Sequence, residues 1–381
     1  MKTLVIFHLW HGPGHFDMSD ESNVWYAKYY EAHFGRVYVV SLIGKKKLEG
    51  TAGKTTFLSL GTGSNKIDVI LSPWRLYKFA KQVSATALLT YEQVWLWWLK
   101  IFIRVFYNRK IYLMPITIPE SIYSATGKSL SRNIPIGIEE KMIDGSYVSC
   151  DYAVTSKGYG NYIDWLQREK IFENKLIIVD KLPEALPTPY FFDQIKAIKK
   201  SAADDKIKLL YVGRLNKEKL VDDLIKMLAI LNADTKKYTL TLIGDGDEKE
   251  HLVQLSKKMK VDGDVQFLGY VSNGQLPHHY TNADVFVSPL TGSSLREAAL
   301  CGVPIVAYKM DWLTTVLQHE KHYLGVAPHD YRDLAAQVQR LTDDPKLKRQ
   351  ISENVKTLAW QLWSPDELEK SLQKVFASAT E

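Results

Sequence analysis

Short apolar runs alternate with segments of helical spacing throughout the second half of the chain. The runs have the length and β-branched content of buried strands, and the segments between them repeat apolar residues every three or four positions. The predicted strands are 208–212, 238–243, 265–268, 285–287 and 305–307, and the predicted helices are 220–231, 247–259, 276–282, a short one ending before Gly302, 333–341, 346–360 and 365–377. Strands that alternate with helices predict a parallel sheet, and therefore a doubly wound α/β domain.

The first half repeats this alternation. A strand at 3–9, a glycine-rich loop, helical spacing within 20–34 and a strand at 37–41 make a βαβ unit, whose loop lies at the carboxyl edge of the sheet. The polar stretch 45–65 predicts a loop or flap. Further predicted elements are strands at 67–71, 110–116, 150–156 and 175–179 and helices at 94–106, 133–147 and 159–169.

The length of 381 residues suits two domains, and prolines at 183, 187 and 189 mark an exit from the first. We predict an amino-terminal Rossmann-like domain at 1–190 and a second one at 191–365. A terminal helix at 366–381 follows, for which packing back on the first domain is one option.

The loop HGPGH has two interpretations. It lacks the full dinucleotide-binding fingerprint, so by itself it is a weak indication of phosphate binding. A tight turn is the simpler interpretation. The alternative is that the backbone of Gly12 and Gly14 lies close to a ligand, with His11 and His15 as polar groups of an acceptor site.

Charge and tryptophan are concentrated in the first half. The net charge is +6, and residues 1–200 carry eight more Lys and Arg than Asp and Glu, which suggests an anionic partner. Residues 94–106 are too short and too charged to span a bilayer. They predict a helix with Lys100 and Arg104 on its polar face, which either packs on the sheet or lies on an anionic membrane together with Trp74, Lys78 and Lys81. We expect no nucleic acid partner, because no nucleic-acid-binding motif occurs.

The two cysteines and the amino terminus bear on location. Two cysteines make neither a disulfide framework nor a metal set, and the first residues lack the apolar length and cleavage site of a signal peptide. These features predict a cytoplasmic protein, with contact at the inner face of the cell membrane as a further option.

Charged, glycine-rich turns follow three strands of the second half. Arg214 follows the first strand and Lys219 begins the next helix, Gly244 begins the turn GDGD, and the turn TGS opens the helix that carries Glu297. A helix amino terminus that faces cations is a diphosphate site by ordinary electrostatics. The alternative is that Arg214 and Lys219 form a solvated pair.

Glu297 also has two interpretations. Ser294 and Glu297 fit a capping box, Gly302 suits the left-handed position past the helix, and Pro304 prevents its continuation. Capping alone can explain this pattern. The alternative is that Glu297 also holds a ligand.

Taken together, these segments resemble the retaining nucleotide-sugar glycosyltransferases of the GT-B type, family 4 (glycosyl transferases group 1). The matching segments are VGRLNKEK (212–219), TLIGDGDEKEHL (241–252), VQFLGYV (265–271), ADVFVSP (283–289) and EAALCGVPIVAY (297–308). The resemblance covers 208–308 well and the first half only in outline. It implies an α/β fold of two Rossmann-like doubly wound domains that face each other across a cleft.

The resemblance also implies a role for individual residues. Arg214 and Lys219 would hold the donor's diphosphate and stabilise the departing nucleotide without a metal. Glu297 would accept hydrogen bonds from the ribose. Backbone groups of Ser294 and Leu295 would bind phosphate, and Tyr270 lies where the family contacts the base. The other implied donor-site residues are Gly213, Gly244, Thr291, Gly292 and Ser293.

This sequence departs from the family's pattern at one important position. The motif E-x7-E requires a glutamate eight residues before Glu297, where Pro289 stands. Thr291 and Ser293 are candidates for its polar role. Asp245 and Asp247 resemble a metal-binding Asp-x-Asp, but we interpret them as a turn and expect no metal and no cofactor.

The expected function is transfer of a sugar from a nucleotide diphosphate sugar, UDP- or GDP-linked, to a hydroxyl of a glycan or lipid-linked acceptor in polysaccharide or glycolipid synthesis. Two alternatives remain. One is a catalytically degenerate partner subunit that binds a nucleotide or glycan, which the missing glutamate permits. The other is a sugar-nucleotide epimerase on the same fold.

Overall fold

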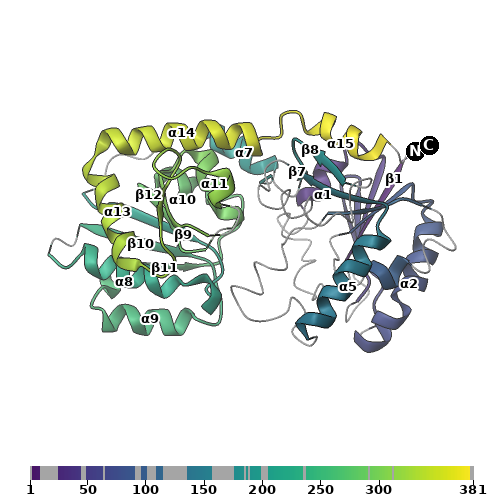
Figure 1. Ribbon diagram of the computed structural model, residues 1–381, viewed down its shortest axis with the longest axis horizontal. Helices are drawn as coiled ribbons and strands as arrows, with labels where there is room; N and C mark the ends of the chain where they lie inside the picture. Colours follow the sequence, from purple (N-terminus) through teal and green to yellow (C-terminus); the bar gives the residue numbers. More distant parts are fainter. Residues whose placement is uncertain are drawn as a thin grey trace. The chain divides into compact units, whose positions relative to one another are not determined.

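The computed structural model describes residues 2–8, 25–43, 49–62, 65–90, 96–100, 109–114, 135–156, 176–183, 186–187, 189–198, 205–234, 237–290, 292–310 and 313–377. The chain divides into two compact units. Unit 1 comprises Met1–Leu186 and Pro365–Glu381, and unit 2 comprises Pro187–Ser364. Each is an α/β unit built on one sheet, as the alternating sequence pattern predicts (Figure 1).

The sheet of unit 1 has eight strands in the order β3-β4-β2-β1-β5-β6-β7-β8. All neighbouring pairs are parallel except β3 and β4, which are antiparallel. The strands are β1 Thr3–His8, β2 Arg36–Ser41, β3 Glu49–Ala52, β4 Thr55–Ser59, β5 Ala87–Thr90, β6 Ile111–Leu113, β7 Tyr152–Ser156 and β8 Leu176–Val179. The chain order reverses between β1 and β5, so the carboxyl end of β1 lies at the switch point of this sheet.

The prediction of a loop or flap at 45–65 was wrong, because part of that stretch forms the hairpin β3–β4. Thr55, Phe57 and Ser59 alternate inward with two partly exposed neighbours, which is the period of a half-buried strand. Gly53 makes the turn with a φ of +63°, a conformation that glycine adopts without strain. A two-residue turn with one glycine is only a weak indication of a hairpin, and the polar composition of the surrounding residues indicated a loop instead.

The predicted strand at 67–71 is instead the first part of α2 (Asn65–Gln82), an 18-residue helix. Buried positions recur at helical spacing, from Asp68 and Ser72 to Leu76 and Ala80. The short apolar run alone fits a strand as well as a helix. The exposed positions that follow recur every three or four residues, which is the spacing of a helix.

Unit 1 also contains the helices α1 (Trp25–Tyr30), α5 (Ile136–Ser149) and α15 (Leu368–Phe376). Figure 1 shows α2 and α5 on one side of the first sheet and α15 on the other. Phe376 of α15 packs against the rings of Tyr30, Phe34 and Tyr112, with ring centroids 4.8–6.2 Å apart. The terminal helix is therefore part of the core of unit 1.

The tryptophan-rich segment is described only at 96–100, where it is helical. Leu96 and Leu99 are fully buried. Lys100 was predicted to lie on an exposed polar face, but only 3% of it is exposed and its Nζ lies 3.7 Å from a carboxylate oxygen of Asp151. A buried lysine needs such a carboxylate. Lys100 therefore faces the protein, and Arg104 lies outside the described residues.

The sheet of unit 2 has six parallel strands in the order β11-β10-β9-β12-β13-β14. They are β9 Ile207–Val212, β10 Tyr238–Ile243, β11 Val265–Gly269, β12 Val285–Ser288, β13 Ile305–Tyr308 and β14 Leu324–Val326. The first five confirm the sequence prediction. The three-residue β14 was too short to give a periodic signal.

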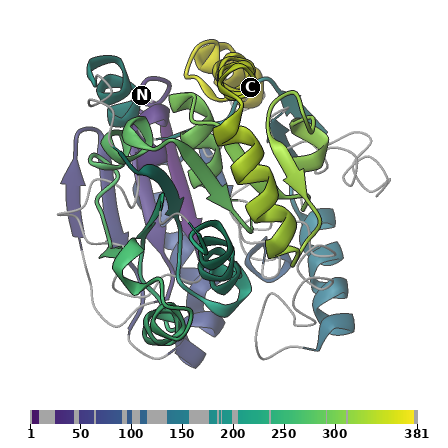
Figure 2. The same ribbon diagram turned by 90° about the vertical axis from the view of Figure 1, so that its left-hand side faces the viewer.

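Helices cover both faces of this sheet. They are α7 (Pro189–Ala197), α8 (Val221–Leu231), α9 (Lys249–Lys258), α10 (Leu276–Asn282), α11 (Ser293–Cys301), α12 (Leu313–Val316), α13 (Tyr331–Asp343) and α14 (Pro345–Trp363). α13 packs on α8, whereas α14 packs on α11. Figure 2 shows α9 and α14 end-on, on opposite sides of the strands. The doubly wound architecture is confirmed. Within the described ranges, no helix combines the length and the apolar character needed to cross a bilayer.

Candidate functional site

The candidate site lies at the carboxyl edge of the unit 2 sheet. The first strand, β9, pairs with β10 on one side and with β12 on the other. The chain order therefore reverses beside β9, and in open α/β sheets ligands bind in the crevice outside the strand ends at such a point. The turns after β9, β10, β11 and β12 all emerge at this edge because all the strands are parallel.

Backbone hydrogen bonds join the first three of these turns. The N–H of Gly213 donates to the carbonyl of Ile243 at 2.9 Å, and the N–H of Gly244 donates to the carbonyl of Gly269 at 2.8 Å. The turn after β10 lies so close to the turn after β9 that a Cβ atom on Gly244 would overlap the carbonyl oxygen of Gly213. Gly244 also has a φ of +129°. Gly244 is thus required for the packing of the two turns.

We predict that Gly244→Ala destabilises unit 2 and weakens any ligand binding at this edge. The substitution combines a backbone conformation that costs a non-glycine residue about 1–3 kcal/mol with a clash against a carbonyl that has no room to move. Thermal unfolding measures the change. Gly263→Ala is the matched control, because a Cβ there meets nothing within 4 Å. An equal melting temperature for both variants would contradict the interpretation.

Arg214 precedes the short 3₁₀ helix η5 (Lys217–Lys219) after β9, and Lys219 is the last residue of that helix. The side chain of Arg214 is 70% exposed, and its nearest carboxylate, that of Glu218, is 4.0 Å away. An exposed pair at this distance is weak, so the guanidinium is available to an anion. The backbone beneath it is fixed, since the hydroxyl of Tyr211 donates to the carbonyl oxygen of Arg214 at 3.0 Å.

The start of α8, just after Lys219, is anchored by a buried carboxylate. Asp223 accepts a hydrogen bond from the Tyr308 hydroxyl at 2.9 Å and pairs with Lys226 at 3.1 Å. Burial and the neighbouring charge of Asp223 raise the pKa of Tyr308, so that it remains a hydrogen-bond donor. Leu220, which joins η5 to α8, has a φ of +53°. Non-glycine residues keep this conformation only where their surroundings impose it.

The capping box predicted for Ser294 and Glu297 is not formed. Helix α11 begins at Ser293, and its N-cap is Gly292, which has no side chain to accept from the first turn. Ser294 is therefore inside the helix. Gly292 has an extended φ of −168°, and the helix starts two residues earlier than the capping pattern implied. The other end is as predicted, with Gly302 in the left-handed conformation at a φ of +73°.

Glu297 has a different partner. The hydroxyl of Tyr280, a fully buried residue of α10, donates to Oε2 of Glu297 at 2.7 Å. Burial raises the pKa of Glu297, and the hydrogen bond from Tyr280 and the charge of Arg296 offset part of this effect. A carboxylate held by one donor on one oxygen keeps acceptor capacity for a ligand. Capping is therefore not the reason for this glutamate.

The predicted donor-site residues within the described part of the chain lie at this one edge. Gly213, Arg214 and Lys219 follow β9, Gly244 follows β10 and Tyr270 follows β11, whereas the residues around α11 are Gly292, Ser293, Ser294, Leu295 and Glu297. Leu295 is fully buried, and its backbone N–H donates to the carbonyl of Gly292 at 3.2 Å, whereas Tyr270 is 65% exposed. Thr291, His11, Gly12, Gly14 and His15 lie outside the described residues.

Asp245 and Asp247 form a turn, as predicted. The carboxylate of Asp245 accepts from the N–H of Gly246 at 3.0 Å and lies 3.7 Å from Nζ of Lys249. Among the residues that the structure describes, no three His, Cys, Asp or Glu side chains are arranged to hold a metal ion.

Sequence reasoning missed the two tyrosines that support the site. Tyr280 orients Glu297, and Tyr211 fixes the backbone of Arg214. Both are buried aromatic residues at positions that a strand or helix pattern assigns to the core. No spacing in the sequence distinguishes a buried tyrosine with a functional hydroxyl from one that only packs.

An exposed arginine, a helix amino terminus and a partly buried carboxylate at a switch point are typical of α/β proteins that bind nucleotides. Residues 193–358 match the family described as Glycosyl transferases group 1. This part of the chain is therefore similar to that family.

Among curated proteins, the chain is similar to an uncharacterised glycosyltransferase of Methanocaldococcus jannaschii. The two are 31% identical over 183 residues, which cover 47% of this chain and 46% of the relative. The chain thus aligns with less than half of the length of this relative.

Two solved structures have the same fold over almost their whole lengths. Sucrose-phosphate synthase from Thermosynechococcus elongatus has a TM-score of 0.76 at 16% identity, covering 99% of this chain and 100% of the other. HepE from Anabaena, in complex with UDP, has a TM-score of 0.70 at 14% identity with the same coverage. At these identities the likeness shows the fold, which confirms two Rossmann-like domains of the GT-B type.

Proposed function

We propose that this protein is a metal-independent, retaining glycosyltransferase. It moves a sugar from a nucleotide diphosphate sugar to a hydroxyl of a glycan or lipid-linked glycan acceptor. The observation that carries the proposal is the set of groups at the carboxyl edge of unit 2, where Arg214 and the amino terminus of α11 follow neighbouring strands. These groups suit a diphosphate, and Glu297 suits the hydroxyls of a ribose.

The same groups supply the chemistry that the reaction needs. When the bond between the sugar and the diphosphate breaks, negative charge grows on the phosphate oxygens. Cations and backbone N–H groups already fixed at that place stabilise this charge more than they stabilise the intact donor, which lowers the barrier. Arg214 and Lys219 fill this role in the proposal. Retention of configuration and a UDP- or GDP-linked donor follow from the family resemblance, and the UDP bound by HepE supports a uridine nucleotide.

Metal independence is supported by the chemistry of the residues. Metal-dependent transferases use carboxylates to hold a divalent cation on the diphosphate. Asp245 and Asp247 have the spacing of a metal-binding Asp-x-Asp at this edge, but Asp245 is already engaged by Lys249 and its own turn. Two basic side chains supply the positive charge instead.

We predict that sugar transfer continues when divalent cations are removed with EDTA. The measurement is product formation from UDP- and GDP-sugars with glycan acceptors, with and without the chelator. Activity that EDTA abolishes and Mg²⁺ restores would overturn metal independence and assign a metal role to Asp245 and Asp247.

Pro289 favours a second candidate function. It stands where the family's first glutamate is expected near the donor sugar, so a catalytically degenerate subunit that only binds a nucleotide or glycan fits the sequence. Such a protein would bind UDP, with a raised melting temperature, and yield no product with any donor. An epimerase, the third alternative, would convert the donor sugar with no acceptor present.

A further inference from the structure

The exposed side of helix α2 in unit 1 is apolar in its first half. Ile67, Ile70, Leu71 and Trp74 are 52%, 64%, 40% and 45% exposed. Their spacing of three and four residues places them on one stripe of the helix. Isolated exposed apolar residues are common on protein surfaces, but four large ones in a continuous stripe mark an interaction surface.

The second half of the same stripe is cationic. Lys78 and Lys81 continue the spacing and are exposed. Nζ of Lys78 lies 5.3 Å from the ring centroid of Trp74, and the ring of Tyr77 lies 5.6 Å from that of Trp74. Tryptophan and tyrosine beside lysine are the residues with which a helix rests on a membrane surface, because their rings are apolar and their polar ends remain hydrated.

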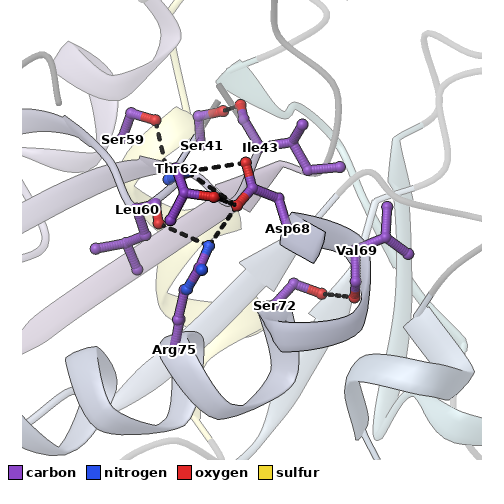
Figure 3. Close-up of polar contacts among 10 residues, drawn as sticks. Ser41, Ile43, Ser59, Leu60, Thr62, Asp68, Val69, Ser72 and Arg75 are labelled. Carbon is purple, nitrogen blue, oxygen red and sulfur yellow. Dashed lines mark hydrogen bonds and ion pairs between the residues drawn. The ribbon is translucent and has the colours of Figure 1, made fainter. Parts of the chain in front are cut away.

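The only acidic residue of α2 lies outside this exposed stripe. Asp68 is fully buried, and Figure 3 shows its carboxylate directed at Thr62 and Arg75. It accepts from the backbone N–H and the hydroxyl of Thr62 at 2.9 and 2.7 Å and from Arg75 at 2.6 Å. Burial raises the pKa of Asp68, but the hydrogen bonds from Thr62 and Arg75 outweigh it, so the pKa lies below its usual value. The exposed stripe therefore carries positive charge alone.

We propose that the exposed stripe of α2, namely Ile67, Ile70, Leu71, Trp74, Lys78 and Lys81, binds the surface of an anionic lipid bilayer. The apolar residues enter the boundary between headgroups and acyl chains, and the two lysines contact anionic headgroups. Trp74, Lys78 and Lys81 are residues for which the sequence offered membrane contact together with the tryptophan-rich segment 94–106. In that segment, however, Lys100 is buried.

The charges favour a membrane over a second copy of the chain. A symmetric dimer through α2 would place the same stripe against itself. It would bury Lys78 and Lys81 against a partner stripe that has no carboxylate to pair with them, which is costly. An anionic bilayer supplies the missing negative charge.

Flotation of the full-length protein with lipid vesicles tests the proposal, and it needs neither a sugar donor nor an acceptor, so its outcome is independent of the proposed function. We expect binding to vesicles of phosphatidylcholine with phosphatidylglycerol, weak binding to phosphatidylcholine alone, and release by salt. The double variant Lys78→Ala/Lys81→Ala should lower the partition coefficient on anionic vesicles about thirtyfold, at about 1 kcal/mol per lysine. Ile70→Ser/Trp74→Ala should lower binding to both kinds of vesicle.

Matched controls use exposed residues of unit 2. Ile230, which is 44% exposed, and Lys258, which is exposed on α9, should be replaceable by serine and alanine without effect on flotation. All variants change exposed side chains, so their melting temperatures should match that of the parent, and this is measured in parallel. Equal flotation of the α2 variants and the controls would overturn the proposal. Absence of vesicle binding together with a dimer that Ile70→Ser/Trp74→Ala dissociates would overturn it in favour of a second copy.

Discussion

Lys219→Ala or Arg214→Ala is expected to lower the turnover number for sugar transfer by about a hundredfold or more. Each removes a positive charge from the place where the diphosphate gains negative charge during bond cleavage. Loss of one such pre-oriented group typically costs about 10²–10³ in turnover. The loss should fall mainly on kcat, because these interactions are stronger in the transition state than in the bound donor. Steady-state kinetics with a saturating donor is the measurement.

Lys217→Ala is the matched control for this experiment. Lys217 is a lysine of the same short 3₁₀ helix and is exposed, but it has no role in the proposed site. Its replacement should leave kcat unchanged. Arg214→Lys separates charge from geometry, since lysine keeps the charge and loses the two-pronged donor pattern of the guanidinium. Near parental rates for Lys219→Ala and Arg214→Ala would remove both residues from the mechanism.

The strands and helices of unit 2 were predictable because its signals are long and agree with one another. Each strand of β9 to β13 is an apolar run followed by a polar or glycine-rich turn, and the intervening helices have their own period. Once the strands are known to be parallel, the turns must share an edge, so the grouping of Arg214 with Glu297 follows from topology. The family motif added the assignment of roles to a site that the strand pattern had already located.

The wrong predictions in unit 1 have a common cause, which is that the local sequence patterns were short or ambiguous. An apolar run of five residues at 67–71 fits a strand as well as a helix, and only the exposed positions further along decide. Lys100 was assigned to an exposed polar face because a charge on a helix usually faces water. Its burial depends on Asp151, a residue far away in the sequence whose position no local pattern reveals.

The error at Glu297 concerns partners rather than secondary structure. Serine three residues before glutamate fits a capping box, but the pattern does not exclude a glycine that starts the helix earlier. Which donor reaches the carboxylate depends on how α10 packs on α11, and that packing places the hydroxyl of Tyr280 on Oε2. The hydrogen-bond network of a site is decided by tertiary packing, which a single sequence does not display.

Replacement of Glu297 by alanine should weaken binding of UDP or GDP by about tenfold to a hundredfold. A hydrogen bond from a ligand hydroxyl to a charged acceptor is worth about 1.5–3 kcal/mol, and alanine removes it. Isothermal titration calorimetry measures the change. Alanine also leaves the buried hydroxyl of Tyr280 without its acceptor, so the variant will be less stable. Glu297→Gln avoids this problem, because its amide oxygen can still accept from Tyr280.

The pH dependence separates a role in binding from a role in stability. Burial raises the pKa of Glu297 in the folded protein, so the carboxylate is protonated at a higher pH than an exposed glutamate, and nucleotide affinity should fall as the pH drops through that raised pKa. The stability contribution has the opposite sign. A carboxyl group whose folded pKa is raised stabilises the fold at low pH and loses this contribution as the pH rises through the folded pKa.

Tyr280→Phe extends this test. It removes the donor that favours the charged form, so the pKa of Glu297 should rise further and the loss of affinity should begin at a higher pH. In Glu297→Gln this part of the pH dependence should disappear. If Glu297→Gln and the parent bind nucleotide equally well at every pH, and only their melting temperatures differ, then Glu297 is a structural residue and the ribose is held elsewhere.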